Sequence, residues 1–347
     1  MRWHALLLQT LWCMVAAAGA AGTPSGAPLT ASAEHRRTPD QTFLTFPEWY
    51  LVHSPAEYAD YLATGAAPSA FPLFAHIGQF WQGYAAVNRE VARYPFNSGY
   101  HLMVLVIGAS TTVEYCLKGI YEHTVGRLAE AIKSGAASVP EERFAANYAQ
   151  DYVTFIRIEP WYRFDFWGQL TRLWSDAPVR GPDLLRRWER RFALTTELLV
   201  KEGYARLIKV GTGTIYDPPK PVTVVVLSKM PELDPVGHPG FVALQSNGSE
   251  VLATVPRYEA FTAYARWLAT QDIAIKEIAG NDGEVLTSVL VPTSWVAAKS
   301  ARVLFEQPII TVPGRKRVVL AVEIARLGTF LRGFDGGESI VEHVYDF

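Results

Sequence analysis

Residues 211–227 read GTGTIYDPPKPVTVVVL, and the character of the chain changes across this stretch. Before it, apolar side chains recur every three or four residues, the period of an α-helix. After it, β-branched residues dominate, which is typical of strands. The prolines within the stretch can continue neither a helix nor a central strand. We therefore predict an α+β protein with a helical domain at 41–210, a linker at 211–221 and, at 222–347, a mainly antiparallel sheet domain with at least one helix.

Helix start signals are dense before this linker. Thr45-Phe-Pro-Glu48, Ser54-Pro-Ala-Glu57 and Ser138-Val-Pro-Glu141 each place a hydroxyl three residues before a carboxylate, the pattern of a capping box. Helical periodicity continues from Leu73 to Val91, and a further helix is expected to begin near Asn97 or Ser98 and to run past Glu130. The remaining helices are expected at 140–157, 160–174 and 182–209.

Two of these helices have unusual surfaces. Leu102 to Val113 contains no charge, and twelve residues are too few to cross a bilayer, so we predict a central core helix, with partial insertion into a membrane as the alternative. The helix at 182–209 is basic and amphipathic, with Arg186, Arg187, Arg190 and Arg191 beside apolar residues. We interpret its arginines as a solvated face, and contact with an anionic membrane surface is the alternative.

The second half is expected to form hairpins. Asn247-Gly248, Asp282-Gly283 and Pro313-Gly314 each lie between apolar runs, where such pairs favour tight turns. One helix is predicted there, from Arg257 to Thr270, with Phe261 and Leu268 on its apolar side.

The N-terminus has the order of a secretory signal. One arginine precedes an uncharged run from Ala5 to Ala21 that ends in small residues. We expect residues 1–22 to be a signal peptide or an uncleaved anchor, and 23–40 to be a linker. The predicted location is therefore outside the cytoplasm, either periplasmic or attached to the membrane by the N-terminal segment.

Composition and motifs exclude several functions. The chain has 347 residues, of which 49% are hydrophobic, and 32 basic side chains oppose 34 acidic ones, so no electrostatic footprint for nucleic acid exists. The strings HExxH, GxSxG, paired Glu-x-x-His and the Walker loop are absent, and the two cysteines give no zinc spacing. We expect no metal and no cofactor.

Three blocks resemble a known family. FLTFPEWYLVHSPAEYADYL at 43–62, YPFNSGYH at 94–101 and VEYCLKGIYE at 113–122 resemble a family of uncharacterised bacterial proteins associated with the cell envelope, and the closing EHVYDF is similar to its tail. The resemblance implies a bacterial envelope setting and no particular chemistry.

The candidate site residues come from the helical half. Glu114, Lys118 and Glu122 follow one another at four-residue steps, and His101, Tyr115 and Glu122 lie on a seven-residue period. These charges could form a buried functional cluster or ordinary exposed ion pairs. Four aromatic residues are candidates for binding an apolar ligand: Trp49, Tyr50, Trp81 and Tyr115.

Two functional hypotheses remain. The first is an exported, envelope-associated binding or assembly module whose aromatic helical domain holds an apolar ligand or an envelope protein, with contact to a membrane surface. The second is an envelope enzyme that uses Glu114 or Glu122 as acid or base, with His101 or Lys118 as a helper. The position of the charged residues relative to a pocket distinguishes the two hypotheses.

Overall fold

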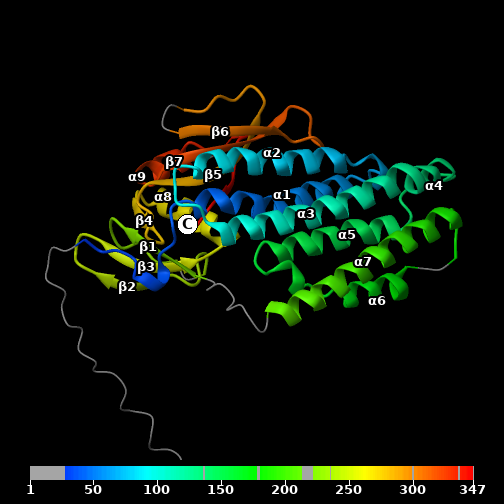
Figure 1. Ribbon diagram of the computed structural model, residues 1–347, viewed down its shortest axis with the longest axis horizontal. Coiled ribbons are helices and arrows are strands. Elements are labelled where there is room, and N and C mark those ends of the chain that lie inside the picture. The colour runs from blue at the N-terminus through cyan, green and yellow to red at the C-terminus, as the bar shows by residue number, and fades with distance from the viewer. Residues whose placement is uncertain are drawn as a thin grey trace, which may run out of the picture.

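A computed structural model describes residues 28–135, 137–177, 180–212, 222–234, 236–298, 301–334 and 337–346. It confirms the α+β class, because a helical region is followed by two antiparallel sheets and two further helices (Figure 1). The predicted signal or anchor at 1–22 and residues 213–221 of the predicted linker lie outside the described residues.

The helices of the first half follow the predicted order, and Figure 1 shows the longer ones as a stack of nearly parallel rods beside the sheets. Their bounds are α1 Gln41–Ala63, α2 Leu73–Val91, α3 Ser98–Tyr121, a π-helical turn Glu122–Gly126, α4 Arg127–Ala131, α5 Pro140–Ile156, α6 Phe166–Asp176 and α7 Leu184–Thr212. Short 3-10 turns lie at Ala33–His35, Pro68–Ala70 and Trp161–Arg163.

Some predicted helix starts are real and others are not. Asn97 caps α3, because its side chain accepts a hydrogen bond from the amide of Tyr100. The boxes at Thr45 and Ser54 are wrong: both residues lie inside α1, which continues through Pro47 and Pro55. Most of the side chains of α1 are buried against neighbouring elements, and this packing outweighs the backbone hydrogen bonds that the prolines remove.

The two sheets each have four strands. The first has the order β2-β3-β1-β4 and the second the order β6-β7-β5-β8, with antiparallel pairing throughout. The bounds are β1 Val222–Leu227, β2 Val242–Ser246, β3 Val251–Pro256, β4 Ile275–Ile278, β5 Glu284–Pro292, β6 Ala301–Pro308, β7 Arg315–Glu323 and β8 Ile340–Val344; the helices are α8 Glu259–Thr270 and α9 Ile324–Arg332.

Two of the three predicted hairpins are confirmed. Asn247-Gly248 joins β2 to β3, and Pro313-Gly314 joins β6 to β7. The hairpin at Asp282-Gly283 is wrong, because this turn carries the chain from β4 in the first sheet to β5 in the second. The turn residues indicate a reversal but not which sheet receives the next strand.

The second sheet is buried on both faces. Val318, Leu320 and Val322 of β7 share one core with α8, α9 and the first sheet. The alternate residues Val319 and Ala321 belong to a second core, which includes the start of α1 and part of α2. The helical region is therefore packed directly on the second sheet, while its division from the rest as a separate domain stays a prediction.

Candidate functional site

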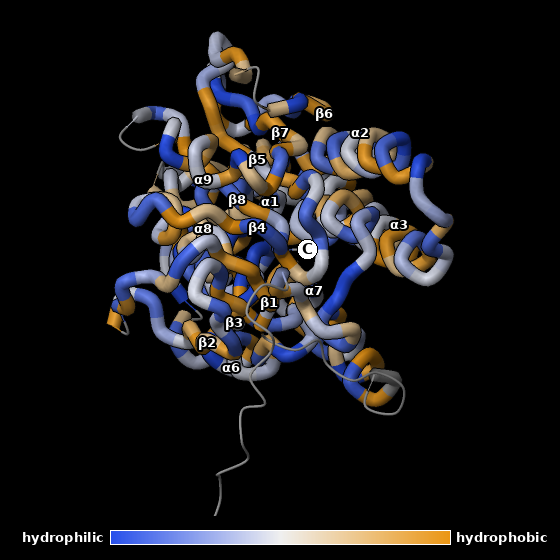
Figure 2. Tube along the Cα trace, turned by 90° about the vertical axis from the view of Figure 1, so that its left-hand side faces the viewer, coloured by the Kyte–Doolittle hydropathy of each residue, from blue (hydrophilic) through white to orange (hydrophobic). Residues whose placement is uncertain are grey.

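The outer side of α3 is apolar and exposed. Its outward residues, each 51–67% exposed, are Leu102, Val106, Val113, Leu117, Ile120 and, in the continuation through α4, Leu128. The predicted core helix at 102–113 is therefore wrong. The continuous helix Ser98–Ala131 is long and apolar enough to cross a membrane, and only 22% of its most apolar window is buried. In Figure 2, α3 lies at the edge of the molecule, beside α2.

The first turns of α7 bury their arginines, and the outer side of the helix is apolar, while Leu194 and Leu198 face the core. Arg186, Arg187, Arg190 and Arg191 are only 1–4% exposed. The outward side carries exposed apolar residues instead: Leu185, Trp188, Phe192, Leu199 and Leu207. The predicted solvated arginine face is thus wrong, because carboxylates from other helices draw the guanidinium groups inward.

These carboxylates come from the neighbouring helices. Arg190 donates to both oxygens of Glu122, at 2.8 and 3.1 Å, and Arg191 contacts Glu141 at 2.7 Å. Arg186 donates from Nε to Glu142 at 2.8 Å. Such bidentate and shared pairs compensate for the cost of removing charges from water. Glu122 is the first residue of the π-helical turn between α3 and α4, where the helix is locally wider.

A second set of charges lies between α3 and α7. Lys118 contacts Glu197 at 3.0 Å, and Lys201 contacts Glu197 and Glu114, both at 3.1 Å. Glu114 and Lys118, which lie four residues apart on α3, therefore contact partners on α7. Burial opposes ionisation of Glu197, but the two ammonium groups hold its pKa well below the usual range. Glu114 is the exposed member, with 44% of its side chain accessible.

The candidate aromatic residues are packed rather than arranged around a pocket. Trp49 is buried, and its ring lies 3.5 Å from that of His343 on β8. The Tyr50 hydroxyl contacts Gln79 at 3.0 Å, and the Tyr115 hydroxyl contacts Ser54 at 2.9 Å. Trp81 is half-buried and donates from Nε1 to Thr112 at 2.9 Å.

His101 lies apart from the charged candidates. It is 5% exposed, and its Nδ1 is 2.9 Å from the hydroxyl of Tyr84 on α2. Its ring stacks on Phe96, with the two centroids 4.7 Å apart. In the contacts that the structure shows, His101 does not join Glu114, Lys118 or Glu122.

Sequence reasoning missed a buried network between α1, α2 and the second sheet. Arg317 of β7 contacts Glu57 at 2.9 Å and Glu342 at 2.7 Å. His53 lies 3.4 Å from Glu342, and His76 lies 3.7 Å from Glu57. Burial lowers the pKa of His53 to about 3 and that of His76 to about 4, so both are neutral near pH 7. Because Arg317 is 1% exposed and His76 is fully buried, a substrate cannot reach them without a structural change.

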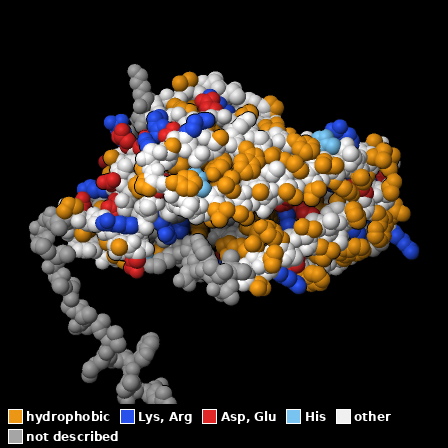
Figure 3. Space-filling view, in the orientation of Figure 1, with side chains coloured by type: hydrophobic (Ala, Val, Ile, Leu, Met, Phe, Trp, Pro, Cys, Tyr) orange, Lys and Arg blue, Asp and Glu red, His pale blue; other side chains and the backbone are white. Residues whose placement is uncertain are grey.

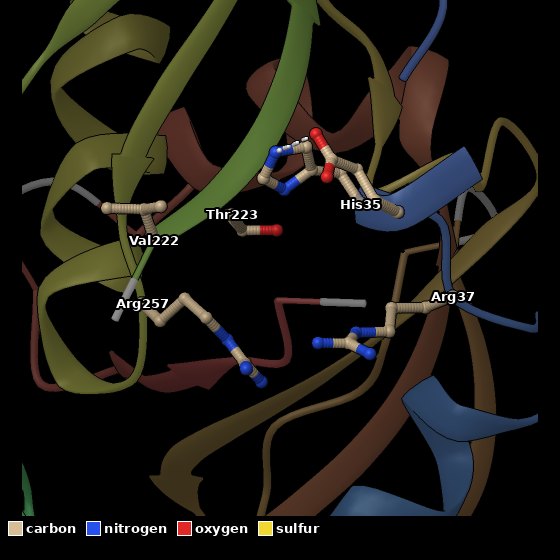
Figure 4. A pocket seen from close by; sticks show the side chains of 6 residues that line it. His35, Arg37, Val222, Thr223 and Arg257 are labelled. Carbon is tan, nitrogen blue, oxygen red and sulfur yellow. Dashed lines mark ion pairs between the residues drawn. The ribbon is translucent and has the colours of Figure 1, made fainter. Parts of the chain in front are cut away.

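A small polar hollow lies elsewhere, where the N-terminal segment meets β1. Figure 4 shows His35, Arg37 and Arg257 directed toward it, with Val222 and Thr223 on the β1 side. Arg257 is engaged with Asp346 at 2.8 Å, and His35 lies 3.5 Å from Glu34. The hollow has room for little more than a water molecule, and none of the predicted site residues lines it.

The contacts and exposures of these residues therefore favour an exposed interaction surface over an enclosed reaction centre as the candidate site. Within the described ranges, no group of three or more His, Cys, Asp or Glu side chains could hold a metal ion. Comparison of the chain with protein-family models, curated proteins and solved structures finds no match.

Proposed function

We propose that the protein is a non-catalytic module of the cell envelope that docks on a lipid bilayer through an apolar face on α3 and α7. This α3/α7 face comprises Leu102, Val106, Val113, Leu117, Ile120 and Leu128 together with Leu185, Trp188, Phe192, Leu199 and Leu207. The observation that carries the proposal is the exposed apolar row on the outer side of α7, which begins where the four arginines of the same helix are buried.

The extent of the apolar surface supports an interaction role. Figure 3 shows hydrophobic side chains gathered in bands over the helical half, whereas Lys, Arg, Asp and Glu are more frequent toward the sheets. Soluble proteins rarely leave large contiguous apolar patches in water. Eleven such residues in two neighbouring rows need an apolar partner.

The charge pattern favours a bilayer as that partner. Where helices contact lipid, ionisable side chains point inward and pair with one another, as the arginines of α7 do. Exposed indoles lie on α7 and on α6, the helix packed against it. Trp167 and Trp174 on α6 and Trp188 on α7 are 42–54% exposed. Indoles are enriched where hydrocarbon meets water. The expected export of the chain would place this surface beside a membrane.

The packing of α3 favours docking in the plane of the membrane rather than spanning it. The inner side of α3 is held against α2, and a Cβ on Gly108 would collide with the ring of Phe80. Val104 and Tyr115 are buried on the same side. A helix with one side fixed to a folded body and the other side apolar is suited to an interfacial position.

The catalytic alternative has less support. Both oxygens of Glu122 are engaged by Arg190, and Lys118 is engaged by Glu197. Glu114 is accessible, but its contact is with Lys201 rather than with a histidine. No observation favours an acid–base pair at these positions.

Flotation with phosphatidylcholine vesicles tests the proposal. We expect the wild-type chain to float with the vesicles, and the double variant Leu117→Glu/Phe192→Glu to remain in the dense fraction, because two charges would enter the interface. Val236→Glu is the matched control, since Val236 is 92% exposed and lies outside the face. Unchanged thermal melts would show that the variants are folded.

Two results would overturn the proposal. One is a wild-type protein that stays in the dense fraction. The other is a lipid-free dimer, measured by light scattering, that the double variant dissociates, because the occupant of the face would then be a second copy of the chain.

A further inference from the structure

We propose that the groove between α3 and α7 binds the phosphate of an anionic lipid headgroup at Lys201 and Lys118, and that Glu114 occupies this position while no lipid is bound. This inference rests on the proposed docking of the α3/α7 face on a bilayer. It adds a lipid class and a specific contact to that function.

The two ammonium groups lie between the apolar rows. The side chains of Lys118 and Lys201 are 18% and 16% exposed, so the groove shields them but does not seal them. Their ammonium groups lie over aromatic rings, Lys118 at 4.3 Å from the Tyr58 centroid and Lys201 at 5.0 Å from that of Tyr152. Figure 3 shows charged side chains in a recess between apolar bands of the helical half.

A hydrogen-bond donor in the groove lacks an acceptor. Tyr148 on α5 is 5% exposed, and its hydroxyl has no hydrogen-bond partner among the residues that the structure describes. Its ring lies 6.3 Å from that of Tyr152, the ring over which the Lys201 ammonium group lies, and burial raises the pKa of Tyr148. A buried, protonated phenol without a partner costs free energy unless an acceptor arrives.

The charge balance selects an anion. Lys118 and Lys201 carry two positive charges, and Glu197, which contacts both, supplies one negative charge. The remaining positive charge is met by Glu114, which is the most exposed of the four and lies in the apolar row between Val113 and Leu117. A phosphodiester with one negative charge could replace this carboxylate on Lys201, and a shift of the buried Tyr148 side chain toward it would add a hydrogen bond to the phosphate. A zwitterionic headgroup would bring an unmatched ammonium group to the same place.

Lipid preference provides the first test. Binding of the full chain is titrated with vesicles of phosphatidylcholine alone and of phosphatidylcholine mixed with phosphatidylglycerol. We expect Glu114→Gln to strengthen binding to the mixed vesicles about fivefold more than binding to phosphatidylcholine alone, the effect of about one charge at an anionic surface. Glu202→Gln makes the same charge change one residue after Lys201, at an acid paired with Arg206, and should have a clearly smaller effect.

Tyr148→Phe tests the specific contact without removing a charge. Because the hydroxyl bonds to none of the described residues, the variant should be at least as stable as the wild type. We expect it to lose about threefold to tenfold of the preference for phosphatidylglycerol, the usual effect of one hydrogen bond. A purely structural Tyr148 would leave the lipid preference unchanged.

The outcomes separate the inference from the proposed function. If the protein binds neither vesicle, both fail. If it binds both vesicles equally and neither Glu114→Gln nor Tyr148→Phe alters the preference, docking stands and the headgroup site is overturned. Binding of inorganic phosphate to the lipid-free chain at Lys201, together with equal binding to the two kinds of vesicle, would show that a free phosphate occupies the groove and would also overturn the lipid assignment.

Discussion

Helices α7 and α8 are both amphipathic, yet the first turns of α7 bury their charged side whereas α8 buries its apolar side. In α8, Phe261, Ala265 and Leu268 are 1% exposed and pack between the two sheets. In α7, the row that contains Phe192 and Leu207 is exposed, while Arg186 and its neighbouring arginines are buried. The period of the pattern predicted both helices, but it did not state which side of each would face inward.

The difference lies in what the neighbours supply. Around α8, the strands of both sheets present valine and isoleucine side chains, so burial of the apolar side is favourable. Around the start of α7, the neighbouring helices present the carboxylates of Glu122, Glu141 and Glu142. The first turns of α7, with four arginines near these carboxylates, bury their charged side, and Leu185, Trp188 and Phe192 are left for another partner.

Removal of a buried arginine should have the largest effect on stability. Arg190→Ala would leave Glu122 buried without its guanidinium partner and Glu189 with Arg186 alone, and we expect the free energy of unfolding to fall by about 3–5 kcal/mol. Chemical denaturation measures this loss. Arg206→Ala is the control, because Arg206 is 67% exposed and its pair with Glu202 should contribute well under 1 kcal/mol at most. Equal losses in the two variants would contradict the inward orientation of the arginines.

Replacement of leucine by alanine should cost more stability in α8, where the leucine is buried, than on the exposed side of α7. Leu268→Ala in α8 should destabilise by about 3 kcal/mol, because it leaves a cavity in a closed core. Leu207→Ala in α7 should change stability by less than about 0.5 kcal/mol, since that side chain is 68% exposed. Thermal melts of both variants provide the comparison, and a large loss at Leu207 would mean that the outward row is covered by protein.

Local patterns predicted the elements, and contacts distant in the sequence decided the site. The bounds of α2, the Asn97 cap and the Asn247-Gly248 hairpin follow from residues close together in the chain. The contact of Arg317 with Glu57 joins residues 260 positions apart, and nothing near either residue indicates it. Lys118 and Glu197 are also far apart in the sequence. Lys118 could therefore be chosen as a candidate residue, but its partner could not be predicted.

Glu48 has no bidentate arginine partner among the described residues, and we expect it to make the stability of the fold depend on pH near neutrality. Burial raises the pKa of Glu48 on α1 from 4.5 to about 7, while a hydrogen bond from Tyr100 and the charge of Arg257 oppose the rise. The folded protein therefore holds a proton that the unfolded chain releases above about pH 4.5. Its contribution to stability is full below that pH and is lost as the pH rises through about 7.

Glu48→Gln should remove this pH dependence. Relative to the variant, the wild type should lose about 2 kcal/mol of unfolding free energy between about pH 5 and pH 8, because ionisation of a buried carboxyl must be accommodated. Urea denaturation of both proteins at each pH measures the difference, and contributions of other groups cancel. A difference that is constant with pH would show that Glu48 titrates normally in the folded state.

The smallest effect on stability is expected at Glu114, the exposed member of the ion pairs between α3 and α7. Because 44% of its side chain is accessible, Glu114→Ala should cost well under 1 kcal/mol in thermal denaturation. A double-mutant cycle between Glu114 and Lys201 should give a coupling of about 0.5 kcal/mol, and a cycle between Glu114 and Lys118 a coupling near zero, since Lys118 contacts Glu197 instead. The reverse result would mean that Glu114 pairs with Lys118 on α3 and not with Lys201 on α7. Glu114 would then not connect the two helices. Glu114 would no longer hold the position on Lys201 that we assign to a lipid phosphate.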